Sequence, residues 1–290
     1  MGVRPSEFFN QKSTSLTDKP AVVNEPTRGL PGLQLRELWL YRELLYFLVW
    51  RDIKVRYKQS VLGISWIVIQ PFLTMVIFTV LFNKILGIGT DSEIPYPIFT
   101  YTALLPWTYF AGSLNRGSTS LVANRNLISK IYFPRLIIPV ANTLPGLVDF
   151  CIAFVILLGM MVYYNIALTA QVLLLPLALL LAVLTVLGVG LWLSALNVQY
   201  RDIQYVTPFL IQIWMYATPI IYQITRIPEQ WLWLYSLNPM VSVIQSFRWV
   251  LLGDTSFGGM NWASVVIVLL ILVSGVIYFR RTERIFADVV

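Results

Sequence analysis

The sequence predicts an all-α integral membrane protein, and three observations support this fold class. Hydrophobic residues make up 57% of the 290 residues and charged residues only 12%, about half the share in a soluble domain. The apolar residues gather in six long runs, each with the roughly 17–25 residues that a spanning helix needs. The alternation typical of barrel strands is missing, so the spans must be helices, because lipid leaves the backbone no other hydrogen-bond partners. A purely soluble enzyme is therefore excluded.

The residue inventory excludes several kinds of functional site. The chain has no histidine and one cysteine, Cys151, which excludes zinc sites built on these residues, disulfides and triads that need an imidazole. A net charge of +7 would suggest nucleic acid in a soluble protein. Cytosolic loops of membrane proteins collect the same basic residues, so we expect no nucleic-acid partner. Neither GxxxxGKS/T nor GxGxxG occurs, so energy for uphill transport must come from a partner or an ion gradient.

Residues 1–60 are predicted to lie outside the membrane core. Residues 1–32 are polar and proline-rich, without the apolar region of a signal peptide, and we expect a disordered cytosolic tail. Residues 33–60 have one charged and one apolar helical face, which predicts an amphipathic helix in the membrane surface. The charged arc contains Arg36, Glu43, Arg51, Lys54 and Lys58, and the apolar arc Leu38, Leu45, Val49 and Ile53. Interfacial aromatic residues are Trp39, Tyr46 and Trp50.

The six apolar runs define a transmembrane domain over residues 61–290. The predicted spans cover about 61–86, 98–121, 136–164, 171–196, 206–224 and 262–279. With six spans both ends of the chain share one side, and that side carries eighteen Lys and Arg residues against three on the other. The positive-inside rule then predicts that both termini are cytosolic.

Residues 230–252 are nearly apolar enough for a seventh span, but two observations argue against one. A seventh span would place Arg280, Arg281 and Arg284 outside, and Asn238-Pro239 breaks the run in its middle. We expect two short helices that enter the outer leaflet and return, as is tolerated where protein covers the backbone. A plain seventh helix is the alternative.

Asp149 is the one acid well inside a predicted span. A carboxylate in the membrane is by default a functional hypothesis, but we favour a hydrogen-bonded Asp149 that fixes helix packing near Pro145-Gly146, because no second acid, His or Lys offers a relay. An enzyme acting on lipid-linked sugars would need a catalytic acid, base or metal carboxylates, and Asp52, Asp149 and Asp202 are the candidates. Adjacent Arg51 and Arg201 suggest ion pairs instead.

Two basic gaps on the predicted cytosolic side are candidate contacts for a partner. Asn124–Arg135 (NRNLISKIYFPR) is amphipathic and closed by Pro134, which favours a short helix parallel to the membrane that presents Arg125 and Lys130. Asn197–Asp202 (NVQYRD) is a smaller second contact. The alternative is that these charges only set the topology.

Aromatic residues make up 14% of the chain and many flank or occupy the spans. Interfacial belts and core packing explain most of them. The sharper hypothesis is a pore lined by aromatic rings, whose faces bind sugars as they bind bases. Its candidates are Phe78, Phe82, Trp107, Tyr109, Phe110, Trp214, Tyr216 and Tyr222.

Four segments together resemble the permease subunits of polysaccharide ABC transporters of the ABC-2 type. They are RDIKVRYKQSVLGISWIVIQP (Arg51–Pro71), NLISKIYFPRLIIP (Asn126–Pro139), NVQYRDIQYVTPF (Asn197–Phe209) and ERIFADVV (Glu283–Val290). Each is weak alone and the combination is specific. The resemblance covers about residues 33–290, so residues 1–32 look like an extension.

The resemblance implies an exporter of lipid-linked polysaccharide, such as O-antigen, teichoic acid or capsule chains, in the bacterial inner membrane. Two permease copies would form the channel, and two separate ATPase subunits, which bind ATP and Mg²⁺, would drive it. The implied ATPase-coupling residues are Arg125, Asn126, Lys130, Arg135, Arg201 and Asp202. Those that admit a lipid pyrophosphate are Arg51, Lys54, Arg56 and Lys58. The implied periplasmic gate, residues 223–252, contains Trp231, Trp233, Tyr235, Asn238 and Pro239. An ABC-2 exporter of drugs or lipids would share the fold and differ only in cargo.

Overall fold

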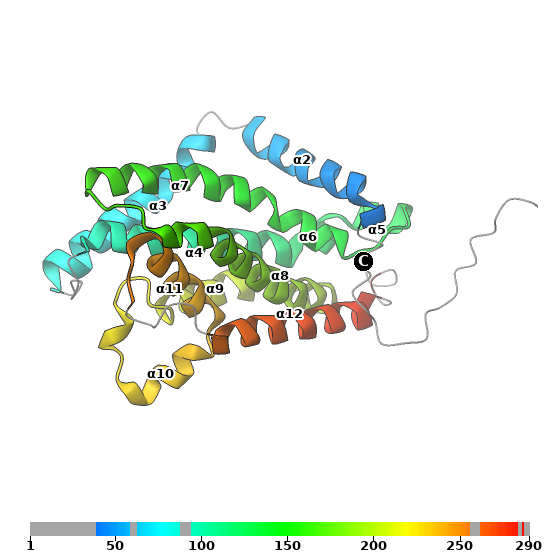
Figure 1. Ribbon diagram of the computed structural model, residues 1–290. Helices are drawn as coiled ribbons and strands as arrows, with labels where there is room; N and C mark the ends of the chain where they lie inside the picture. The colour runs from blue at the N-terminus through cyan, green and yellow to red at the C-terminus, as the bar shows by residue number, and fades with distance from the viewer. Residues whose placement is uncertain (1–38, 59–62, 88–93, 256–261, 284–285, 287–290) are drawn as a thin grey trace, which may run out of the picture. The chain divides into compact units, whose positions relative to one another are not determined.

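The computed structural model describes residues 39–58, 63–87, 94–255, 262–283 and 286, and this part of the chain is helical, without a strand (Figure 1). The all-α fold class is therefore confirmed, while the predicted tail of residues 1–32 lies outside the described residues. The helices are α2 (Arg42–Lys58), α3 (Gly63–Phe78), α4 (Tyr96–Ala123), α5 (Arg125–Lys130), α6 (Ile137–Thr143), α7 (Pro145–Tyr163), α8 (Leu175–Gln199), α9 (Ile203–Tyr216), α10 (Glu229–Ser236), α11 (Pro239–Leu252) and α12 (Trp262–Glu283). A π-helical stretch, Thr79–Ile85, extends α3, and 3₁₀ turns occupy Ala170–Leu174 and Ile224–Arg226.

Helix α4 is the centre of the bundle. It packs against α3, α6, α7, α8, α9 and α11, and most of its side chains are buried. Its 28 residues correspond to a length of about 42 Å at 1.5 Å per residue. The N-terminal end of α4 meets the segment before α10, through a hydrogen bond of 2.8 Å from the Tyr96 hydroxyl to the Ile221 carbonyl. Its C-terminal end leads into α5, so these two regions lie at opposite ends of the bundle (Figure 1).

Helices α8 and α12 approach each other through two glycines. A Cβ atom on Gly275 would lie 2.6 Å from the Gly188 carbonyl oxygen, and one on Gly188 would lie 2.9 Å from the Leu272 backbone nitrogen. Both distances are shorter than van der Waals contact, so the backbones touch only because these residues have no side chain. Nearby, the Trp192 indole stacks on Tyr278 and donates to Ser274 Oγ at 3.2 Å.

Four described helical stretches are long and apolar enough to cross a membrane: Ser65–Ile85, Ile137–Tyr163, Ala170–Gln199 and Ala263–Glu283. They coincide with the first, third, fourth and sixth predicted spans. The second prediction, 98–121, falls within α4, which is long enough but carries polar residues along its length. The fifth, 206–224, differs: α9 ends at Tyr216. Pro219 follows shortly after, and a proline lacks the N–H that a continuing helix needs.

Residues 230–252 form two helices, α10 and α11, rather than one. The break falls at Asn238-Pro239, as the sequence predicts. Asn238 caps α11 by accepting a hydrogen bond of 3.0 Å from the Met240 N–H, and Pro239 occupies the first helical position, where a missing N–H costs nothing. The alternative of a plain seventh helix is therefore wrong.

Candidate functional site

Helix α2 packs against the bundle on one side and is exposed on the other. Leu48 is buried in an apolar cluster with Ile128 of α5 and Phe279 of α12, and α2 also packs on α6 and α7. The predicted interfacial residues Trp39, Tyr46 and Trp50 are exposed. A helix with exposed aromatic rings beside a membrane span has the composition expected at the boundary between lipid headgroups and acyl chains.

The four basic residues predicted to admit a pyrophosphate divide into two pairs. Lys54 and Lys58 are exposed. Arg51 forms an ion pair of 2.9 Å with Asp52 and donates a hydrogen bond of 3.2 Å to the Asn124 side-chain oxygen. Arg56 forms an ion pair with Asp149 of α7. Thus two of these side chains face outward and two hold α2 against the bundle.

Asp149 is held by two residues of α2. Besides the ion pair with Arg56, the Tyr57 hydroxyl donates a hydrogen bond of 2.6 Å to Asp149 Oδ1. Burial raises the pKa of the Tyr57 phenol and the adjacent carboxylate raises it further, so the phenol stays protonated and acts as the donor. The side chains of Arg56 and Asp149 are only 25% and 23% exposed. These contacts favour the packing interpretation of Asp149.

Arg116 of α4 lies beside Asp149, Arg56 and Tyr57. The sequence offers no indication of this position. Arg116 Nη2 donates to Ser113 Oγ at 3.3 Å. Gly146, at the start of α7, leaves room for both: a Cβ there would lie 2.5 Å from Ser113 Oγ and 2.9 Å from Arg116 Nη2. The Pro145-Gly146 step, near which the sequence predicts helix packing, therefore lies in close contact with polar side chains of α4.

Helix α5 has one buried and one exposed face. Ile128 and the following Phe133 are buried, whereas Arg125, Asn126 and Lys130 are exposed. The exposed apolar side chains of Ile131 and Tyr132 follow directly. This combination of cations and apolar groups on a short helix fits a protein-docking surface.

The other residues predicted for ATPase coupling differ in exposure. Arg201 and Asp202, between α8 and α9, are exposed. Arg135 is occupied within the chain: its backbone N–H donates to Glu283 Oε1 at 3.0 Å, and its guanidinium donates to the Glu283 carbonyl. Glu283 also pairs with Arg280 at 3.0 Å. Arg135 therefore ties the α5 region to the end of α12.

The predicted channel aromatics occupy three environments. Trp107, Tyr109 and Phe110 are buried in the core of the bundle, where Phe110 packs edge-on against Trp214 at 5.1 Å between ring centroids. Buried rings of this kind cannot line a channel formed at the surface of one chain. Phe78 and Phe82 pack edge-on at 5.6 Å and are half-buried. Tyr216 is 55% exposed, and Tyr222 lines the pocket described below.

At the opposite end, Asn238 and Arg248 hold the irregular segment 217–223. Asn238 accepts a hydrogen bond of 2.8 Å from the Trp214 indole and donates one of 3.1 Å to Thr218. Arg248 of α11 is fully buried, and it donates to the carbonyls of Pro219 and Ile220 at 2.7 and 3.0 Å. Its guanidinium lies 3.5 Å from the Phe99 ring centroid. From the sequence, Arg248 is predicted only to be one of the three basic residues on the outer side, with Lys84 and Arg226.

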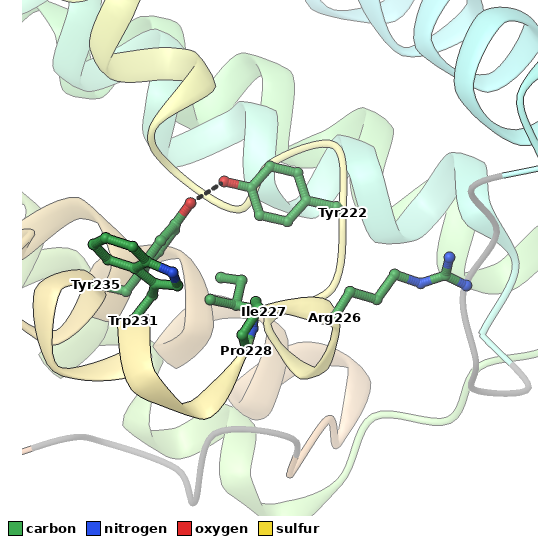
Figure 2. Close-up of a pocket in the computed structure, with 6 residues that line it drawn as sticks. All are labelled: Tyr222, Arg226, Ile227, Pro228, Trp231 and Tyr235. Carbon is green, nitrogen blue, oxygen red and sulfur yellow. Dashed lines mark hydrogen bonds between the residues drawn. The ribbon is translucent and has the colours of Figure 1, made fainter.

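A pocket of about 570 Å³ lies beside α10, and we call it the α10 pocket (Figure 2). Its lining consists of Tyr222, Arg226, Ile227, Pro228, Trp231 and Tyr235. The hydroxyls of Tyr222 and Tyr235 lie 3.0 Å apart, and Trp231 is 49% exposed. Trp233, on the same helix and also predicted in the gate, is 63% exposed and lies outside this lining. Within the described residues no three His, Cys, Asp or Glu side chains gather as metal ligands would.

Comparison with known families identifies the class of membrane protein. The sequence pattern of the ABC-2 type transporter family matches residues 43–252, well over half of the chain and most of the described helices. The chain belongs to the ABC-2 type transporter family. The match runs from α2 to α11 and so includes both ends of the bundle described above.

Several individual proteins are similar to this chain over nearly their whole length. The chain is 32% identical to the O-antigen export system permease protein RfbA of Myxococcus xanthus over 256 residues, which is 86% of this chain and 96% of that protein. An RfbA of Klebsiella pneumoniae is also 32% identical, over 85% of this chain and 95% of its own. The polysialic acid transport protein KpsM of Escherichia coli is 25% identical over 241 residues, which is 80% of this chain and 91% of that protein.

Proposed function

We propose that this chain is the channel-forming permease subunit of an ATP-driven exporter that moves lipid-linked polysaccharide of the O-antigen kind across the bacterial inner membrane. The observation that carries the proposal is the similarity over nearly the full length of permeases named for O-antigen export. Similarity to a polysialic acid transport protein argues for a polysaccharide rather than a drug or lipid cargo. A membrane-embedded enzyme is not favoured, because the similar proteins are named as permease or transport proteins. Two of the three candidate acids, Asp52 and Asp149, are also ion-paired to arginine, whereas exposed Asp202 forms no ion pair among the described residues.

The proposed topology has six spans and cytosolic termini. The four long apolar stretches supply four of the spans, and α4 and α9 supply the other two. The α5 end then faces the cytosol, and α10 and α11 dip into the outer leaflet as a periplasmic gate. Two copies of the chain would enclose the channel. Since Trp107 and Tyr109 are buried, exposed Tyr216 is the better candidate among the predicted aromatics for a surface that becomes channel wall.

Two separate ATPase subunits would bind ATP and Mg²⁺ and dock on α5 through Arg125, Asn126 and Lys130, with a second contact at Arg201 and Asp202. The exposure of these side chains supports the assignment. A rigid-body shift of the ATPase pair would move α5 and, through Asn124, α2. The Asp149 contacts would pass the shift on to α7.

The exposed cations Lys54 and Lys58 would attract the pyrophosphate of the lipid-linked substrate at the membrane surface. Arg51 and Arg56 contribute less to this step in our proposal, because their charges are already compensated by Asp52 and Asp149.

Charge reversal on α5 tests the assembly. We expect Arg125→Glu with Lys130→Glu to prevent co-purification of a P-loop ATPase and to abolish surface polysaccharide in the cell that encodes the chain. Lys84→Glu, an exposed charge near the other end, is the matched control and should retain both. Unchanged co-purification and ATP turnover in the α5 variant would remove this segment from the ATPase contact. Intact surface polysaccharide in a strain lacking the chain would overturn the proposed function.

A further inference from the structure

The α10 pocket has a composition suited to a sugar. We propose that it binds a pyranose unit of the exported polysaccharide, with Trp231 as the stacking platform and the Tyr222–Tyr235 pair as hydrogen-bonding partners. The inference rests on the proposed function and adds to it a defined glycan site on the gate itself. The pocket volume of about 570 Å³ lies within the range of small-ligand sites.

Trp231 supplies an accessible aromatic face. The residue is 49% exposed although it lines the pocket, and Figure 2 shows its indole beside Tyr235, with Ile227 and Pro228 nearby. A pyranose ring has an apolar face of C–H groups and a polar rim of hydroxyls. An aromatic side chain removes that apolar face from water and leaves the rim free for hydrogen bonds.

The hydrogen bonds of the two tyrosines give the pocket a defined polarity. The Tyr222 hydroxyl donates to the Tyr216 carbonyl at 3.2 Å. With its proton used there, Tyr222 accepts from Tyr235 across the 3.0 Å contact, since each phenol has one proton. The Tyr235 oxygen retains lone pairs, which can accept from a sugar hydroxyl. An acyl chain would leave these polar atoms without a new partner.

Charge in the pocket is compatible with neutral or acidic sugars. Among its lining residues Arg226 is a cation and none is an acid. The Arg226 side chain extends away from the Trp231–Tyr235 pair (Figure 2). The stacking and hydrogen-bonding groups therefore lie on one side of the pocket, and the basic group lies on the other.

The test compares two tryptophans on one helix. The full chain, purified with its ATPase in lipid nanodiscs, is titrated with oligosaccharides released by mild acid from the surface polysaccharide of the same cell, and binding is followed by saturation-transfer NMR. We expect Trp231→Ala to weaken binding about tenfold and to slow export. Trp231→Phe should keep most of the affinity. Trp233→Ala, outside the pocket lining, should bind like wild type.

The outcomes separate this site from the proposed function. Suppose that wild type and Trp231→Ala bind the oligosaccharide with equal affinity, and that deletion of the chain abolishes surface polysaccharide in the cell. The sugar site would then be overturned, whereas the proposed export function would be supported. Binding of a short-chain phosphatidylcholine that is weakened by Trp231→Ala, with oligosaccharide affinity unchanged in that variant, would assign the pocket to lipid and also overturn the proposal.

Discussion

Arg51 of the surface helix donates a hydrogen bond of 3.2 Å to the side-chain oxygen of Asn124, the residue between α4 and α5. The same amide donates through Nδ2 to the Ser120 carbonyl at 2.9 Å. One side chain thus joins α2 to the point at which the longest described helix ends and the proposed ATPase contact begins.

Replacing this amide should loosen the junction. We expect Asn124→Ala to lower the free energy of unfolding by about 1 kcal/mol, because it removes two partly buried hydrogen bonds. Thermal unfolding in nanodiscs measures the loss, and Asn126→Ala, an exposed neighbour, is the control. Combining Asn124→Ala with Arg51→Ala should cost less than the sum of the single changes, so strict additivity would argue against the contact.

The Arg56–Asp149 pair predicts a charge effect that can be separated from a shape effect. Asp149→Asn retains an oxygen for the Tyr57 hydroxyl but leaves Arg56 and nearby Arg116 without a counter-charge. We expect a loss of about 1–2 kcal/mol, since the pair is only partly buried. The double variant Arg56→Gln/Asp149→Asn should recover part of the loss. A melting temperature equal to wild type in Asp149→Asn would contradict a stabilising role for the Arg56–Asp149 ion pair.

Arg248 is expected to be the most costly of these positions. Arg248→Met removes the hydrogen bonds that satisfy two buried carbonyls, on Pro219 and Ile220, and we expect about 2–4 kcal/mol of destabilisation. Arg42→Met, on the exposed side of α2, should stay within about 0.5 kcal/mol. Abundance in cells and thermal unfolding give the comparison. Arg248→Lys should also destabilise the protein, because an ammonium group lacks the forked guanidinium geometry that reaches both carbonyls.

Glycine positions offer a test with a built-in control. Gly275→Ala would place a Cβ 2.6 Å from the Gly188 carbonyl, and forcing α8 and α12 apart should cost about 1–3 kcal/mol despite the better helix propensity of alanine. At Gly159 of α7 a Cβ meets nothing within 4 Å, so Gly159→Ala should be neutral or stabilise by up to about 1 kcal/mol. A stable Gly275→Ala protein would show that the two backbones separate more easily than their contact suggests.

Features set by neighbouring residues could be predicted from the sequence, and those set by distant ones could not. The break at Asn238-Pro239 was predictable because a proline and its capping residue act locally. Pro219 is a local signal for the early end of α9, but the arginine that satisfies the Pro219 and Ile220 carbonyls, Arg248, lies about 30 positions away along the chain. The run over 206–224 contains no charged residue, and its polar residues, Thr207, Gln212, Thr218 and Gln223, are spread along it, so hydropathy alone does not mark this end.

The same distinction applies to the candidate sites. Asp149 stood out as a lone acid in an apolar run, but its partner Arg56 is 93 positions away and looked like one of several surface cations. Apolar patterning also cannot separate a ring that faces a channel from one in the core, which is why Trp107 and Tyr216 were grouped although one is buried and the other exposed. The burial of Arg248 could have been suspected only from its place as the one charged residue of the helix Pro239–Leu252.

The glycine contact between α8 and α12 also limits how the protein can change shape. Helices whose backbones touch cannot slide or turn against each other without breaking that contact. We therefore expect α8 and α12 to move together as one rigid body. Any widening of the molecule during a transport cycle then has to be taken up at weaker joints. One such joint is Leu144, where α6 ends and α7 begins.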